Sequence, residues 1–219
     1  QANNSSIIGN RPDLRWRNDG LYCHVSVIRM DKQKNIYQIS SKTILQMREV
    51  AKDKVAKYAN NVGVYGHNKV ERQVLAWMGE YAVRQLYRVS GINAHQNIKN
   101  DDDPDLTIPA HTTLSTQEPA RQEEVKSWKT GFSWDEYGGT ITEYHAEKYA
   151  RKNRARVWFC EVDMTTGVVV VHGWLTPAEI LETDTRITSS GVNYQALVMH
   201  RVSEVLPNIE DVELSGGWW

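Results

Sequence analysis

Two stretches in the first half of the chain repeat apolar residues at spacings of three and four, which predicts helices with one buried face. The first begins at Ser40 or Ser41, either of which can cap a helix, and runs to about Asn60. The second runs from about Lys69 to Val89. The apolar positions are Ile44, Met47, Val50, Ala51, Val55 and Tyr58 in the first stretch and Val70, Val74, Trp77, Met78, Tyr81 and Leu86 in the second.

Shorter apolar runs, separated by turn-forming residues, predict strands. Two of them, Leu21–Met30 and Ile36–Ile39, flank a polar turn and predict a hairpin near the N-terminal end. The later runs predict strands over residues 92–98, 105–108, 122–128, 155–162, 168–174 and 193–202.

Two more helices complete the pattern. Thr140 can cap a helix that runs to about Lys152, and Pro177 opens a short helix that ends near Glu182. From residue 69 onward the order is helix, three strands, helix, strand. This order predicts an α/β (mixed α+β) fold in which helices flank a mixed β-sheet.

Charge is unevenly distributed along the chain, although the net charge of all 219 residues is −1. Residues 1–60 hold 11 Lys and Arg against 5 Asp and Glu, whereas residues 61–219 hold 15 against 22. Binding a polyanion needs local cations and not a basic average. We therefore expect residues 1–60 to form a basic extension of hairpin and helix that grips DNA, and residues 61–219 to form the catalytic domain; a merely solvated basic surface is the alternative.

Several classes of protein lack support in the sequence. The two cysteines, Cys23 and Cys160, form no CxxC pair, and the seven histidines show no HxH or HExxH spacing, which argues against zinc and iron–sulfur sites. Motifs for a phosphate-binding loop, a dinucleotide fold and a hydrolase elbow are also missing. No apolar run approaches the roughly 20 residues of a membrane span. We expect a soluble cytoplasmic protein with no membrane partner and no nucleotide cofactor.

Acidic and basic residues that suit metal-assisted chemistry lie on two neighbouring predicted strands. Pro104-Asp105 opens one strand, and Glu124-Val125-Lys126 lies on the next. Because side chains alternate along a strand, Glu124 and Lys126 share one face while Val125 points into the core. Two carboxylates and one ammonium can thus meet.

Such a set fits phosphodiester hydrolysis. Carboxylate oxygens hold Mg²⁺, which polarises a phosphoryl oxygen and lowers the pKa of an attacking water. Lys126 can orient that water and neutralise developing charge. Asp105 and Glu124 would repel each other without a cation between them.

Together, these residues and their order resemble the PD-(D/E)XK nuclease superfamily, whose core is a helix, a three-stranded meander, a helix and a further strand. The resemblance covers roughly residues 68–206 and includes Glu80 in Gly79-Glu80-Tyr81-Ala82, which is similar to the family's helix glutamate. It implies a restriction-endonuclease-like core. By this resemblance Asp105 and Glu124 are metal ligands, Val125 lends its carbonyl, Lys126 serves the water, and Glu80 supports the metal.

Neighbouring acidic residues compete for these roles. The run Asp101-Asp102-Asp103 precedes Asp105 and could form a calcium loop, but Leu106 stands where an EF-hand requires Gly, so we expect the run to be surface. Glu123 should face away from the site, as a structural or exposed residue. Glu71 is a weaker alternative to Glu80.

Basic and aromatic residues near these segments are candidates for DNA contacts. Trp128 follows Glu124 and Lys126 on the same face and either borders the groove or packs in the core. Arg156 belongs to the basic cluster after the catalytic segment. The candidate contacts are Lys42, Arg48, Lys52, Lys54, Lys57, Trp128, Lys129, Arg151, Lys152 and Arg154.

The function expected from this sequence is a Mg²⁺-dependent DNA endonuclease that cleaves with a metal-activated water, with Mn²⁺ as a substitute metal. A homodimer would permit double-strand cleavage. A recombination or repair nuclease acting on ends, flaps or junctions would use the same site. The third alternative is a catalytically silent nuclease-like module that only binds DNA, and an intact Asp105, Glu124, Lys126 and Glu80 argues against it.

Overall fold

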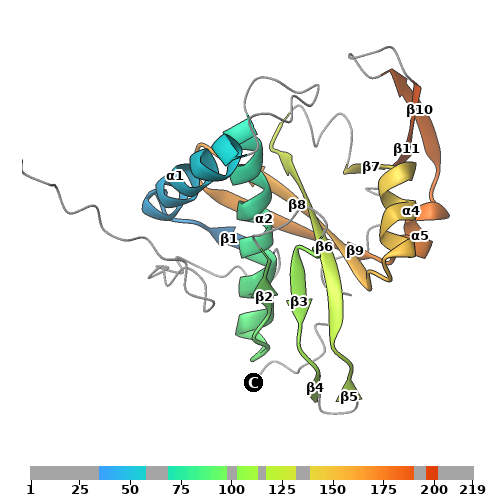
Figure 1. The fold of residues 1–219 in the computed structure, drawn as a ribbon, viewed down its shortest axis with the longest axis horizontal. Helices are drawn as coiled ribbons and strands as arrows, with labels where there is room; N and C mark the ends of the chain where they lie inside the picture. The colour runs from blue at the N-terminus through green and yellow to red at the C-terminus, as the bar shows by residue number, and fades with distance from the viewer. Residues whose placement is uncertain are drawn as a thin grey trace, which may run out of the picture.

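A mixed β-sheet flanked by helices forms the centre of the molecule (Figure 1). The computed structural model describes residues 35–57, 69–97, 103–112, 117–131, 139–189 and 196–201. The predicted strand Leu21–Met30, and with it most of the basic N-terminal segment, lies outside the described residues. The mixed α+β class expected from the sequence is confirmed.

Within the described ranges the main sheet has the strand order β1-β9-β8-β6-β3-β2. Its strands are β1 (Ile36–Gln38), β9 (Val168–Leu175), β8 (Arg156–Asp163), β6 (Arg121–Lys129), β3 (Leu106–Ile108) and β2 (His95–Gln96). β6 and β8 run parallel, with Glu124 opposite Val157 and Lys126 opposite Phe159. The other neighbours in this sheet are antiparallel.

Two helices, α1 (Ser41–Lys57) and α2 (Lys69–Val89), share the core on one face of the sheet. Their apolar stripes, including Met47 and Val74, pack with Val125 and Trp158 of the sheet. β1 and α1 therefore belong to the same core as the rest of the sheet. The described part of the expected N-terminal extension is not a separately packed unit.

The opposite face carries α4 (Glu143–Arg151) and α5 (Pro177–Leu181). Ala146 and Tyr149 of α4 and Ile180 of α5 pack with Val157 and Phe159 of β8. Thr176 and Glu179 form a capping box, which explains the abrupt start of α5. The sheet thus carries a separate apolar cluster on each face.

A smaller sheet, in the order β10-β11-β7, lies beside α4 (Figure 1). Its strands are β10 (Thr185–Ser189), β11 (Ala196–Arg201) and β7 (Thr140–Thr142), and β4 (His111–Thr112) pairs with β5 (Gln117–Glu118). The prediction that Thr140 caps a helix is wrong. Thr140 is in β7, and Thr142 caps α4 by accepting a hydrogen bond from the backbone N–H of His145. Strand β10 was not expected, because its mixed polar and apolar residues resemble a loop.

No helix among the described residues is long and apolar enough to cross a membrane.

A close approach between Gly79 of α2 and Ser127 of β6 fixes the helix on the sheet. A methyl group at Gly79 would overlap the hydroxyl of Ser127 on β6, so only glycine lets the helix lie this near the strand. The residue after this contact is Glu80.

Candidate active site

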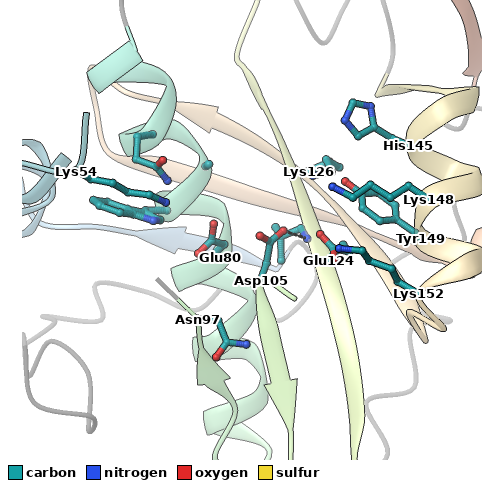
Figure 2. Close-up of a pocket in the computed structure, with 14 residues that line it drawn as sticks. Lys54, Glu80, Asn97, Asp105, Glu124, Lys126, His145, Lys148, Tyr149 and Lys152 are labelled. Carbon is teal, nitrogen blue, oxygen red and sulfur yellow. Dashed lines mark hydrogen bonds between the residues drawn. The ribbon is translucent and has the colours of Figure 1, made fainter. Parts of the chain in front are cut away.

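The residues predicted to act together line one cavity of about 300 Å³ between α2, β6 and α4 (Figure 2). Asp105 lies just before β3, Glu124 and Lys126 come from β6, and Glu80 from α2. The cavity is lined by Lys54, Gln73, Ala76, Trp77, Glu80, Asn97, Asp105, Glu124, Val125, Lys126, His145, Lys148, Tyr149 and Lys152. Segments that are distant in the sequence are therefore brought to one place.

Asp105 is held by both its backbone and its side chain. Its carbonyl accepts a hydrogen bond from the backbone N–H of Asn97 at 3.0 Å, and the Asn97 side-chain amide donates to the carbonyl of Pro104 at 2.8 Å. Carboxylate Oδ2 accepts from the backbone N–H of Val125 at 2.8 Å. The start of β3 is thus tied to the middle of β6, beside Glu124.

Glu124 is buried and bonded to one cation. The Arg154 guanidinium donates from Nε to Glu124 Oε1 at 2.6 Å, and also donates to the side chain of Gln122. The backbone of Arg154 bonds to the Tyr149 carbonyl at the end of α4, so this pair also connects α4 to β6. Within the described residues no donor reaches the second oxygen of Glu124.

Glu80 is buried on α2 and faces the same cavity (Figure 2). Its Oε2 accepts a hydrogen bond from the Gln96 side chain at 2.7 Å. Because Gly79 lets α2 lie against Ser127 of β6, Glu80 is brought close to the strand that carries Glu124. Glu71, the weaker alternative, instead forms a two-point pair with Arg48 and does not line the cavity.

Lys126 extends from β6 toward α4. Its ammonium lies 5.1 Å from the centre of the Tyr149 ring. Burial alone would lower the pKa of Lys126, but the Tyr149 phenol and the carboxylates of Asp105 and Glu124 outweigh it, so this pKa lies above its usual range. Lys126 is therefore a permanent cation at neutral pH and suits electrostatic work better than proton abstraction.

The carboxylates destabilise one another's charge. Burial, followed by the charge of Asp105, raises the pKa of Glu124 to about 7. The same two causes, in the same order, raise the pKa of Glu80 well above its usual range. Clustered carboxylates of this kind are stabilised in their ionised form by a nearby cation.

The carboxylate oxygens of Asp105 and Glu124 are the kind of ligand that Mg²⁺ and Mn²⁺ prefer. Among the residues that the structure describes, no group of three or more His, Cys, Asp or Glu side chains is arranged to enclose a metal ion. Mg²⁺ usually keeps several waters and takes one or two carboxylates, which Asp105 and Glu124 offer. A closed cage of protein ligands is therefore not required.

The expected DNA contacts fall into different groups. Lys54 and Lys152 line the cavity, and Lys42, Lys52 and Lys129 are exposed outside it. Arg48 pairs with Glu71, Lys52 with Glu49, and Arg151 with Glu147. Lys57 ends α1, but its side chain lies outside the described residues.

Two of the expected DNA contacts, Arg154 and Trp128, are partly or fully buried. Arg154 is not a surface cation: its side chain is 4% exposed and paired with Glu124. Trp128 is half-buried and stacks on Phe159, with ring centres 5.7 Å apart. Packing is thus one established use of Trp128, and the expectation that Arg154 contacts phosphate is wrong.

Several residues of the cavity were not singled out from the sequence. His145, Lys148 and Tyr149 lie with Lys152 along one side of α4. Their spacing of three and four residues is a visible helical signal, but it indicates a shared face and not which face meets the strand of Glu124. Gln96 and Asn97, which hold Glu80 and the Asp105 segment, carried no pattern.

Comparisons of the chain with protein-family models, with curated proteins and with solved structures found no match.

Proposed function

We propose that this protein is a Mg²⁺-dependent DNA endonuclease with a restriction-endonuclease-like core. One observation carries the proposal: Asp105, Glu124, Lys126 and Glu80, from three separate elements, line the same cavity. The cavity lies between α2, β6 and α4, and Asp105 enters it from the segment just before β3. Metal-assisted hydrolysis of a phosphodiester can use such a combination, with carboxylates to hold the metal and a cation beside the phosphate.

Each residue has a role that follows from its surroundings. Asp105 and Glu124, with the carbonyl of Val125 and the support of Glu80, are the groups that would hold the metal. A bound Mg²⁺ supplies charge that polarises the phosphoryl oxygen and acidifies the attacking water. Gln96 and the Val125 N–H keep Glu80 and Asp105 in place.

Lys126 acts on the phosphate side of the reaction. Because its pKa is raised, it stays charged and can donate hydrogen bonds to the attacking water or to an equatorial oxygen of the phosphoryl group. Tyr149 lies against the ammonium and restricts its position. The charge that develops on the phosphate during attack is thus met by a fixed cation.

The test is cleavage of supercoiled, linear, single-stranded and branched DNA with Mg²⁺, Mn²⁺ or EDTA. Asp105→Asn and Lys126→Ala should each lower the rate by roughly a hundredfold or more. Asp103→Asn is the matched control, since Asp103 is exposed in the same acidic segment and does not line the cavity. Full cleavage by both site variants, or cleavage in EDTA, would overturn the proposal; the preferred substrate distinguishes an endonuclease from a nuclease of ends or junctions.

A further inference from the structure

The cavity is divided by charge into two parts. Glu80, Asp105 and Glu124 lie in its centre, and cations lie on both sides of them (Figure 2). Lys54 comes from α1 on one side, and Lys148 and Lys152 come from α4 on the other. An anionic ligand is attracted to either side, while a divalent cation is attracted to the centre.

The α4 side is a continuous surface of the helix. His145, Lys148 and Lys152 follow one another at spacings of three and four and all line the cavity. Arg151, beside Lys152 in sequence, is exposed, does not line the cavity, and pairs with Glu147 at 3.4 Å. The helix therefore presents two of its cations to the cavity and directs another away from it.

The local potential on this side is positive. Burial lowers the pKa of His145, and the charges of Lys126 and Lys148 lower it further. A neutral imidazole beside two ammonium groups can still exchange hydrogen bonds with an anion. Nδ1 of His145 already lies 2.6 Å from the Thr142 hydroxyl, which leaves Nε2 as the nitrogen for a ligand.

We propose that Lys148 and Lys152, with His145 beside them, form a phosphate-binding subsite for a polynucleotide strand that crosses the carboxylates from Lys54 to α4. The subsite rests on the proposed function for the identity of its ligand, DNA. It does not require that the protein hydrolyse the DNA. A free phosphate ion satisfies one side of the cavity only. A polynucleotide carries phosphates at regular intervals and can engage both sides at once.

The experiment measures binding of labelled duplex and single-stranded DNA in EDTA by fluorescence anisotropy over a salt series. Lys148→Gln and Lys152→Gln should each weaken binding several-fold and reduce the slope of log K against log salt by about 0.9 for duplex or about 0.7 for a single strand. Lys54→Gln should reduce the slope similarly. Arg88→Gln is the control, because Arg88 is exposed in the last turn of α2 and does not line the cavity, and it should leave the slope near that of the wild type.

Equal loss in the control and cavity variants would overturn the subsite, as would an unchanged slope in Lys148→Gln and Lys152→Gln. Inorganic phosphate at matched ionic strength is added as a competitor. If millimolar phosphate displaces the DNA, the subsite takes small anions and the polynucleotide assignment fails. If DNA binding depends on these lysines but the protein does not cleave DNA in Mg²⁺, the nuclease function is rejected and the subsite stands. If the protein cleaves DNA equally well without these lysines, the subsite is rejected and the nuclease function stands.

Discussion

Two adjacent glutamates on β6 lie in opposite chemical environments. Glu123 is fully buried and accepts hydrogen bonds from the Tyr87 hydroxyl at 2.8 and 2.9 Å, from Arg121 Nε at 2.7 Å and from Trp158 Nε1 at 2.7 Å. Within the described part of the chain Glu124 accepts a hydrogen bond from Arg154 alone, and it lies near the charge of Asp105. Among the described residues, Glu123 accepts hydrogen bonds from three side chains, whereas Glu124 accepts from one and lies beside a second carboxylate.

This difference separates a structural carboxylate from a ligand. Glu123 uses its hydrogen-bonding capacity within the protein and joins α2 to β6 and β8. Glu124 retains capacity that a cation can use. The expectation that Glu123 faces away from the site as a structural residue is confirmed, while the alternative that it is exposed is wrong.

The largest effects are expected when each glutamate becomes glutamine. Glu123→Gln should lower the free energy of unfolding by about 3 kcal/mol, because it removes the buried negative charge that pairs with Arg121 and accepts from Tyr87 and Trp158. Glu124→Gln should lose less stability, because the raised pKa of Glu124 means that the folded protein accommodates a neutral group there, but it should cleave DNA roughly a hundredfold more slowly. Thermal melts in EDTA and cleavage rates on the same samples check both. The contrast fails if the two variants show the same pattern of losses.

Substitution of Arg154 tests whether its hydrogen bond positions the carboxylate of Glu124. Arg154→Met should weaken Mg²⁺ binding and cleavage by about 10- to 100-fold, since partners that orient a metal ligand typically have effects of this size. Metal binding is measured by calorimetry without DNA. Arg154→Lys, which can restore one hydrogen bond, should recover part of the affinity. Unchanged metal affinity in Arg154→Met would mean that the guanidinium serves packing alone.

Metal binding at Glu124 should depend on pH, because a proton competes with Mg²⁺ for its carboxylate. The pKa of Glu124 is raised to about 7 in the metal-free protein. Below that pH the proton competes with Mg²⁺, so the half-saturating Mg²⁺ concentration should rise about tenfold for each pH unit. Because a carboxyl with a raised pKa is more easily protonated when folded, ionising it as pH rises from about 4.5 through 7 lowers stability. Metal-free protein should therefore lose stability over that window, and Glu124→Gln should lose less.

The smallest expected effect concerns the helix that brings Glu80 to the site. Gly79→Ala should lower the free energy of unfolding by about 1 kcal/mol, because the added methyl overlaps the Ser127 hydroxyl. The double variant Gly79→Ala with Ser127→Gly should recover most of this loss. A melt of the four proteins of this cycle checks it; no rescue would place the strain elsewhere than at Ser127.

Local patterns predicted the elements better than the contacts between them. The helix over residues 69–89 and the short strand that begins near Asp105 follow from periodicity and turn residues, and the structure has α2 and β3 there. Alternation also placed Val125 correctly in the core. The signal was local in each case, so one stretch of sequence was enough.

The rest depends on pairing between distant segments. Arg154 meets Glu124 because β8 runs parallel to β6, and nothing near residue 154 encodes that neighbour. The same holds for Lys148, whose face of α4 is chosen by the apolar contacts of Ala146 and Tyr149 with β8. Thr140 and Thr142 are equally good caps in sequence, and strand pairing of Thr140 with Arg201 decides between them.

Parallel pairing of β6 with β8 also sets an order of events during synthesis. Parallel neighbours need a long crossover, and here it contains α4 and ends just before Arg156. A growing chain that has reached Lys129 already carries Glu80, Asp105, Glu124 and Lys126, but it has neither Arg154 nor the wall of α4. Contacts between such distant segments form late in folding. The carboxylates are therefore synthesised before the residues that hold them in place, and the site can assemble only after α4 and β8 have been made.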